Sequence, residues 1–80
     1  MKGRKLRPLH LPSPVPVRID DRGRPVATGG REIVQIREIW RIDDEWWREP
    51  LSRLYFEVIL ENGKRAVLYR DLTDGRWYGQ

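Results

Sequence analysis

The sequence predicts a mainly β protein: a small antiparallel sheet, curled or closed into a barrel, of five to six strands with one short helical turn near residues 43–50. Apolar residues alternate with other residues over 15–19, which is the period of a half-buried strand. An Asn-Gly pair separates two apolar runs, a strong hairpin signal. The chain of 80 residues can bury only a thin core, which a curled sheet shares among its strands.

Basic residues and prolines gather in the first third of the chain. Residues 1–31 hold eight Lys or Arg against two Asp, whereas residues 32–80 hold eight basic and ten acidic residues. Five of the six prolines also lie in the first segment, and proline fixes φ and cannot donate a ladder hydrogen bond. We therefore expect an extended, basic, Pro-rich arm over 1–14 and a single small β domain over 15–80.

The first strands of the domain follow from local patterns. A strand over 15–19, a turn at 20–24 and a strand over 25–28 precede the Gly29-Gly30 break. Residues 32–42 are predicted as one long strand because they are rich in β-branched residues, with a helix as the alternative. Eleven extended residues span about 36 Å, more than a globule of about 30 Å, so this strand should bend at a bulge.

Two segments connect the remaining strands. In DDEWWREP, residues 43–50, Asp43 or Asp44 can cap a helical turn that Pro50 then ends. Asn62-Gly63 predicts a two-residue type I′ turn between 54–60 and 65–70. The register of that turn places four side chains on one face, which we predict to be core: Phe56, Val58, Val67 and Tyr69. A second turn, ending in Asp-Gly, leads to a last strand over 76–78.

Composition narrows the function classes. The absence of cysteine excludes disulfides, thiolate zinc sites and cysteine nucleophiles, and favours a reducing, cytoplasmic setting. No apolar run approaches the roughly 18 residues of a membrane-spanning helix, so no membrane association is expected. The single histidine, His10, lies in the arm, away from any rigid scaffold for a Ser–His–acid triad. The acidic pairs lack calcium-loop spacing. We expect no enzyme, cofactor or metal.

The arm and the tryptophans are the candidate contact residues. Phosphate groups of nucleic acid could pair with four basic side chains: Lys2, Arg4, Lys5 and Arg7. Trp46 or Trp47 could stack on single-stranded bases or contact a protein partner. Alternatively, the arm only improves solubility, and tryptophans supply core bulk, as we expect of Trp40 and Trp77. Because Trp46 and Trp47 are adjacent, one is expected to plug the end of the sheet and the other to be partly exposed.

Six features follow one another in order along residues 32–80: Trp40, DDEWW, Arg53 before an apolar strand, Asn-Gly, VLYRD and GRWY. Their order resembles a small bacterial domain family that occurs alone and at the C-terminal end of ImuB-type Y-family DNA-polymerase-like proteins. The upstream LPSPVPVRIDDRGRPV is similar to the entry segment ahead of that domain. The resemblance implies a context of error-prone translesion synthesis, in which such proteins work with a RecA-like accessory protein, the sliding clamp and a C-family polymerase.

Two functions are therefore expected. The first is a non-enzymatic accessory or interaction module, associated with translesion DNA synthesis and repair through that resemblance, with protein partners in a repair assembly. The alternative is a β domain that binds single-stranded nucleic acid weakly and with little regard to sequence. The oligomeric state is left open by the sequence.

Overall fold

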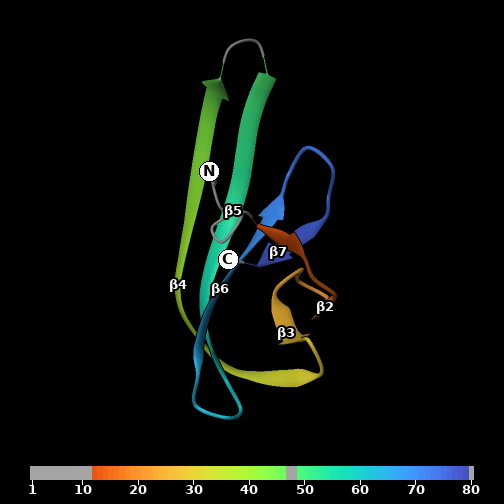
Figure 1. Cartoon of the computed structure of the whole chain (residues 1–80), viewed down its shortest axis with the longest axis vertical. Helices are drawn as coiled ribbons and strands as arrows, with labels where there is room; N and C mark the ends of the chain where they lie inside the picture. The colour runs from red at the N-terminus through yellow and green to blue at the C-terminus, as the bar shows by residue number, and fades with distance from the viewer. Residues whose placement is uncertain (1–11, 47–48, 80) are drawn as a thin grey trace, which may run out of the picture.

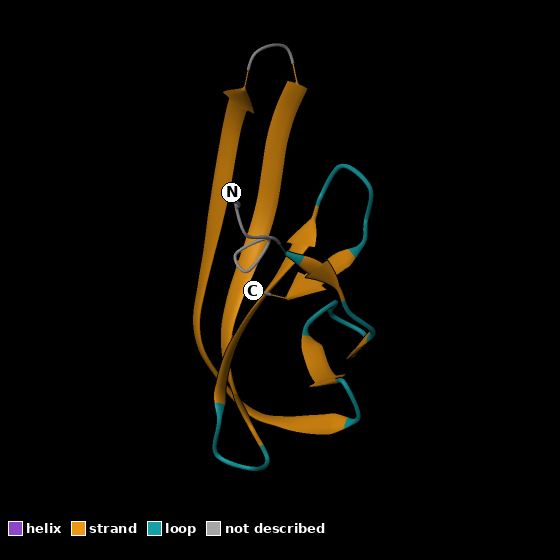
Figure 2. Cartoon of the chain, viewed as in Figure 1, coloured by secondary structure: helices purple, strands orange, loops and turns teal. Residues whose placement is uncertain are grey.

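The protein folds into one antiparallel, seven-stranded sheet that curls into a half-barrel (Figures 1 and 2). The computed structural model describes residues 12–46 and 49–79. The strands are β1 (Ser13–Pro14), β2 (Val17–Ile19), β3 (Pro25–Thr28), β4 (Arg31–Trp46), β5 (Glu49–Leu60), β6 (Arg65–Asp71) and β7 (Trp77–Gly79). Their order across the sheet is β1-β7-β6-β5-β4-β3-β2. The predicted all-β, antiparallel, curled architecture is confirmed, with seven strands instead of five to six.

The curl of the sheet follows from its strand order. β1 and β2 occupy opposite edges of the sheet, yet only Val15 and Pro16 connect them. Seven flat strands would span about 29 Å between the edges, whereas three successive Cα–Cα steps reach about 11 Å at most. The two edges must therefore approach each other. β1 is a two-residue edge strand paired with Tyr78 and Gly79, a position that tolerates proline.

A long hairpin of β4 and β5 dominates the sheet (Figure 1). The two strands pair from Ile33–Leu60 to Trp46–Glu49, with register shifts that leave Val34 and Arg37 as extra residues. An extra residue bends a strand and increases its twist. The predicted bend in this segment is thus confirmed, and β4 can reach both β3 and the far end of the hairpin.

The helical turn predicted near residues 43–50 is wrong for the residues that the structure describes. Asp43 pairs with Ser52, and the ladder continues to Trp46–Glu49. The Asp43 carboxylate accepts hydrogen bonds from Arg41 Nε and Ser52 Oγ, both at 2.6 Å, and so does not cap a helix. Pro50 is tolerated because β6 pairs with β5 only over residues 53–59, which leaves one side of β5 unpaired at this point. Residues 47–48 lie outside the described residues.

The hairpin of β5 and β6 has a different turn from the one predicted. Gly63 N donates to Leu60 O, and Leu60 N donates to Lys64 O, both at 2.8 Å, so three residues form the loop instead of two. This is the pattern of a type I turn followed by a glycine bulge. The type I′ turn occurs instead at Gly29-Gly30, where φ is +58° and +79° and Thr28 pairs with Arg31.

The extra loop residue shifts the register of β6 by one and corrects the predicted core. Phe56 pairs with Leu68, and Tyr55 pairs with Tyr69. Because a one-residue shift exchanges the two faces of a strand, Leu68 joins Phe56 and Val58 in the core cluster. Tyr69 is buried on the opposite face. Val67, which was predicted to be core, also moves to that face and is half-buried.

Gly63 provides a direct test of the observed turn. Its φ is +85°, and a Cβ built there would have no neighbour within 4 Å, so backbone strain is the main penalty of a substitution. We expect Gly63→Val to lower the free energy of unfolding by about 1–2 kcal/mol. Lys64→Val, at an exposed position beside it, should cost less. Chemical denaturation of both variants measures the difference, and equal losses would contradict the left-handed conformation.

Candidate interaction edge

One side of β4 lacks a neighbouring strand among the described residues. β4 pairs with β5 from Ile33 to Trp46, but it pairs with β3 only at Arg31 and Glu32. We call the unpaired side of residues 33–46 the open edge. Backbone N–H and C=O groups that point outward from such an edge are free to bond another strand.

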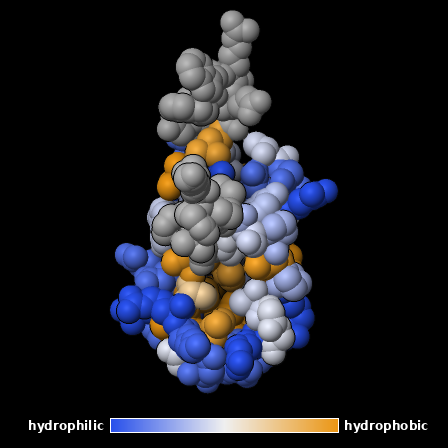
Figure 3. All heavy atoms as spheres, in the orientation of Figure 1, coloured by the Kyte–Doolittle hydropathy of each residue, from blue (hydrophilic) through white to orange (hydrophobic). Residues whose placement is uncertain are grey.

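The open edge carries apolar side chains that are unusually exposed. Of the six large hydrophobic residues exposed in the described part of the chain, four lie on β4: Val34, Ile39, Trp40 and Ile42. The last three, in the regular part of the strand beyond the bulges, are 49%, 37% and 39% exposed. Figure 3 shows apolar residues on the surface of the β4–β5 hairpin, apart from those where the sheet curls around its core. Residues 33–46 contain neither Lys nor Pro, which often protect edge strands.

Trp40 is also the end of a row of neighbouring aromatic rings, some stacked and some tilted, that crosses four strands. Trp40 of β4 pairs with Tyr55 of β5, which pairs with Tyr69 of β6, which pairs with Tyr78 of β7. Successive ring centroids are 5.2, 5.0 and 5.1 Å apart. Directly opposed residues share a face of the sheet, so these four side chains form one continuous aromatic row.

The inner members of the aromatic row have structural roles. Tyr55 and Tyr69 are only 6% and 2% exposed. The guanidinium of Arg53 lies 4.5 Å from the centroid of the Tyr69 ring and donates a 3.2 Å hydrogen bond to the Tyr55 hydroxyl. Tyr78 donates to Asp74 at 2.9 Å, and this bond raises the pKa of Tyr78. The row therefore packs rings side by side across the sheet as far as the open edge, where Trp40 is partly exposed to solvent.

A polar cluster lies next to Trp40 on the opposite face of the hairpin. Asp43 accepts hydrogen bonds from Arg41 and from Ser52 of β5. The hydrogen bond from Arg41, followed by that from Ser52, holds the pKa of Asp43 below its ordinary value. The ionised carboxylate thus fixes a charged pair on the open edge itself.

The hydrogen bonds to Asp43 predict that the stability of the folded chain depends on pH. Because the pKa of Asp43 is lower in the folded chain than in the unfolded chain, its contribution to stability is present above about pH 4. That contribution disappears as the pH falls through the folded-state pKa. NMR titration of the Asp43 carboxyl carbon should show its pKa rising towards the ordinary value in Arg41→Gln, and rising less in Ser52→Ala. No change in Arg41→Gln would contradict the assignment of the main cause.

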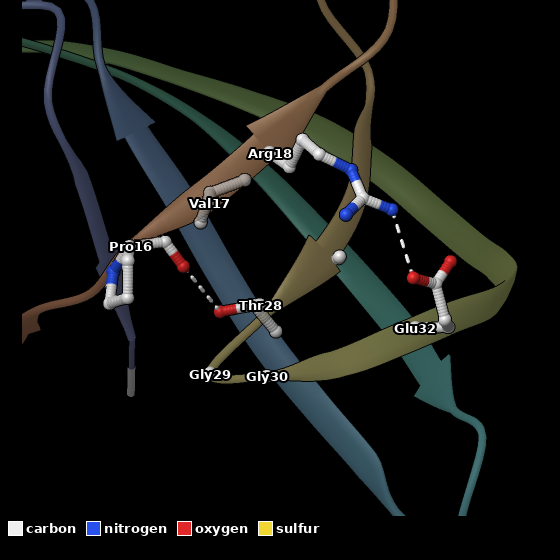
Figure 4. A pocket seen from close by; sticks show the side chains of 8 residues that line it. Pro16, Val17, Arg18, Thr28, Gly29, Gly30 and Glu32 are labelled. Atoms are coloured by element: carbon white, nitrogen blue, oxygen red, sulfur yellow. Dashed lines mark hydrogen bonds and ion pairs between the residues drawn. The ribbon is translucent and has the colours of Figure 1, made fainter.

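A shallow hollow near the β2–β3 hairpin has a volume of about 430 Å³ (Figure 4). It is lined by residues of both strands, by the Gly29-Gly30 turn and by Glu32. Thr28 Oγ1 donates to Pro16 O at 3.1 Å, and Arg18 forms an exposed 2.9 Å ion pair with Glu32. These polar groups are already paired with one another, so the hollow presents little chemistry to a ligand.

The contact residues predicted from the sequence lie mostly beyond the part of the chain that the structure describes. Lys2, Arg4, Lys5, Arg7 and Trp47 lie outside the described residues. The backbone of Trp46 belongs to β4, whereas its side chain is not described. The structure places the two tryptophans that we predicted to be core in different settings. Trp77 packs against the core cluster as expected, but Trp40 stands partly exposed on the open edge.

Charge does not single out a surface for nucleic acid in the described chain, which holds eleven Lys or Arg and twelve Asp or Glu. Among these residues, no group of three or more His, Asp or Glu side chains is arranged to hold a metal ion. The same residues include no helix of the length and apolarity needed to cross a membrane.

No protein-family model, curated protein or solved structure matches this chain. The resemblance to ImuB-type C-terminal domains therefore stays a prediction.

Proposed function

We propose that this domain is a non-enzymatic interaction module that binds an extended segment of a protein as an additional strand along the open edge of β4. The observation that carries the proposal is the combination, on the unpaired side of one strand, of free backbone groups with the exposed side chains of Ile39, Trp40 and Ile42. In recognition by strand addition, main-chain hydrogen bonds supply affinity, and alternate side chains supply specificity.

The two faces of the open edge would receive different side chains from the bound strand. On one face, Trp40 and Ile42 offer apolar contacts, and a residue opposite Trp40 would extend the aromatic row beyond Tyr55. On the other face, Ile39 lies beside the Arg41–Asp43 ion pair. We therefore expect a bound segment in which apolar residues alternate with residues that can meet a charged pair.

A repair context is part of the proposal. The order of aromatic residues and turns along residues 32–80, which resembles the end domain of ImuB-type proteins, supports a partner in a translesion DNA synthesis assembly. Single-stranded nucleic acid is the less favoured partner. The described residues are nearly balanced in charge, and Tyr55 and Tyr69 are buried against their neighbours, so they offer no free ring face to a base.

Peptide selection tests the open edge and does not require that the partner be identified first. A random peptide library displayed on phage is selected on the immobilised protein, and the enriched peptides are synthesised and titrated. We expect peptides with alternating apolar residues, whose affinity falls about tenfold or more for the Ile39→Lys/Ile42→Lys variant. Leu72→Lys is the matched control, because Leu72 is 38% exposed in the loop after β6.

Two outcomes would contradict the proposal. One is that no peptide is enriched above the level seen with the double-lysine variant. The other is that the chain binds a single-stranded oligonucleotide at low salt, and that binding is unaffected by Ile39→Lys/Ile42→Lys. The second outcome would support the nucleic-acid alternative instead.

A further inference from the structure

We propose that the segment bound at the open edge is β4 of a second copy of this chain, paired antiparallel about a twofold axis that passes through Trp40. This inference rests on the proposed function, because it requires that the open edge accepts a strand. The pairing would join two seven-stranded sheets into one. Twofold interfaces are the commonest in homo-oligomers, and they require a surface that complements itself.

The charge pattern of residues 37–43, REIWRID, restricts where such an axis can lie. Residues equally distant from the axis face each other across the two strands, and like charges directly opposed are destabilising. An axis at any of the four charged positions opposes that residue to its own copy: Arg37, Glu38, Arg41 and Asp43. An axis at Ile39 opposes Arg37 to Arg41. Within this segment, only Trp40 and Ile42 remain.

The aromatic row and the extent of the open edge favour Trp40 over Ile42. With the axis at Trp40, the two indoles meet, and the aromatic rows of both copies become continuous through the interface. Arg37 of each copy, the extra residue of a bulge, lies near Asp43 of the other, which gives two attractive pairs. With the axis at Ile42, Arg41 would oppose Asp43 in two attractive pairs as well, but Trp40 would oppose Asp44, and the aromatic rows would not meet.

The axis at Trp40 also lies close to the middle of the open edge. The edge covers residues 33–46, and its midpoint lies between Ile39 and Trp40. Both Trp40 and Ile42 are exposed, as is Ile39 on the other face, and all three would lose contact with water in this pairing. A second copy thus pairs outward backbone groups, covers the exposed apolar side chains and brings Arg37 near Asp43 on the same strand.

Charge reversal tests the pairing and its register. Sedimentation of the full chain over a concentration series up to about 1 mM measures the Kd of the dimer. Arg37→Glu alone and Asp43→Lys alone each convert two attractive pairs into repulsive ones, so we expect each to raise Kd about tenfold. In an equimolar mixture of the two variants, heterodimers have only attractive pairs, and association should return to within about threefold of wild type. Arg22→Glu, in the β2–β3 turn, should leave Kd unchanged.

Each of the following results would overturn the inference or part of it. A wild-type chain that stays monomeric throughout the series excludes the dimer. If Asp43→Lys weakens association but the mixture does not recover, the axis is not at Trp40. If Arg22→Glu weakens association as much as Arg37→Glu, net charge and not the register is responsible. A monomeric chain that nevertheless binds selected peptides at the open edge refutes the dimer alone, whereas failure of both experiments refutes the proposed function as well.

Discussion

Replacing Phe56 with Ala should lower the free energy of unfolding by about 3–5 kcal/mol. Phe56 is 3% exposed, belongs to the core cluster with Val58 and Leu68, and packs against the tilted ring of Trp77 with ring centroids 5.4 Å apart. The truncated side chain would leave a cavity that a sheet this thin cannot fill by collapse. Because small domains have a stability of only about 5–15 kcal/mol, this is a large fraction of the total.

Val67→Ala is the informative comparison for Phe56→Ala. The register observed in the structure puts Val67 on the face opposite Phe56, where it is half-buried. We expect Val67→Ala to cost clearly less than Phe56→Ala when both are measured by urea denaturation. A cost for Val67→Ala equal to that for Phe56→Ala would contradict the three-residue loop and the register that follows from it.

Tyr69→Ala should be comparably destabilising, by about 3–5 kcal/mol, because the side chain is the centre of the aromatic row. The Tyr69 ring is 2% exposed and contacts the rings of Tyr55 and Tyr78 and the guanidinium of Arg53. Its removal would leave the Arg53 guanidinium without the ring that it packs against, and it would break the aromatic row in the middle. Aromatic pairs contribute about 0.5–1.5 kcal/mol beyond burial.

Tyr69→Phe separates the ring from its hydroxyl. Burial raises the pKa of Tyr69, which means that the neutral phenol is favoured in the folded chain. Phe keeps the ring and its stacking, so we expect Tyr69→Phe to cost less than about 1 kcal/mol. Thermal unfolding of both variants provides the measurement, and a loss in Tyr69→Phe as large as in Tyr69→Ala would show that the ring is not the stabilising group.

Local patterns in the sequence predicted the elements of this fold better than their pairing. The alternation around Val17 and the turn residues near Gly63 both correspond to observed structure. The turn type at Asn62-Gly63 could not be deduced, because the same dipeptide fits a two-residue and a three-residue loop. The one additional residue in the longer loop decides whether Val67 or Leu68 enters the core.

The position of the candidate site could not be predicted from local patterns, because it depends on how the strands pair. Asp43 followed by tryptophans is a fair helix N-cap, but pairing with Ser52 across the hairpin overrides that local preference. The exposure of Trp40 follows from the short pairing between β3 and β4, because the four residues of β3 pair with β4 only at Arg31 and Glu32. One signal was present in the sequence: residues 32–42 carry apolar residues in both phases of the strand, more than a single core face requires.

Amide hydrogen exchange along β4 tests most directly whether the open edge takes up a strand. The wild-type chain is compared by NMR at low concentration, at high concentration and with a selected peptide. Outward-pointing amides, at alternate residues within 38–43, should exchange freely in the dilute chain and should become protected when the edge is occupied. Inward-pointing amides, bonded to β5, should be protected throughout. Unchanged exchange of the outward amides, with new protection at β2 or at the β5–β6 turn instead, would contradict the assignment of β4 as the interaction edge.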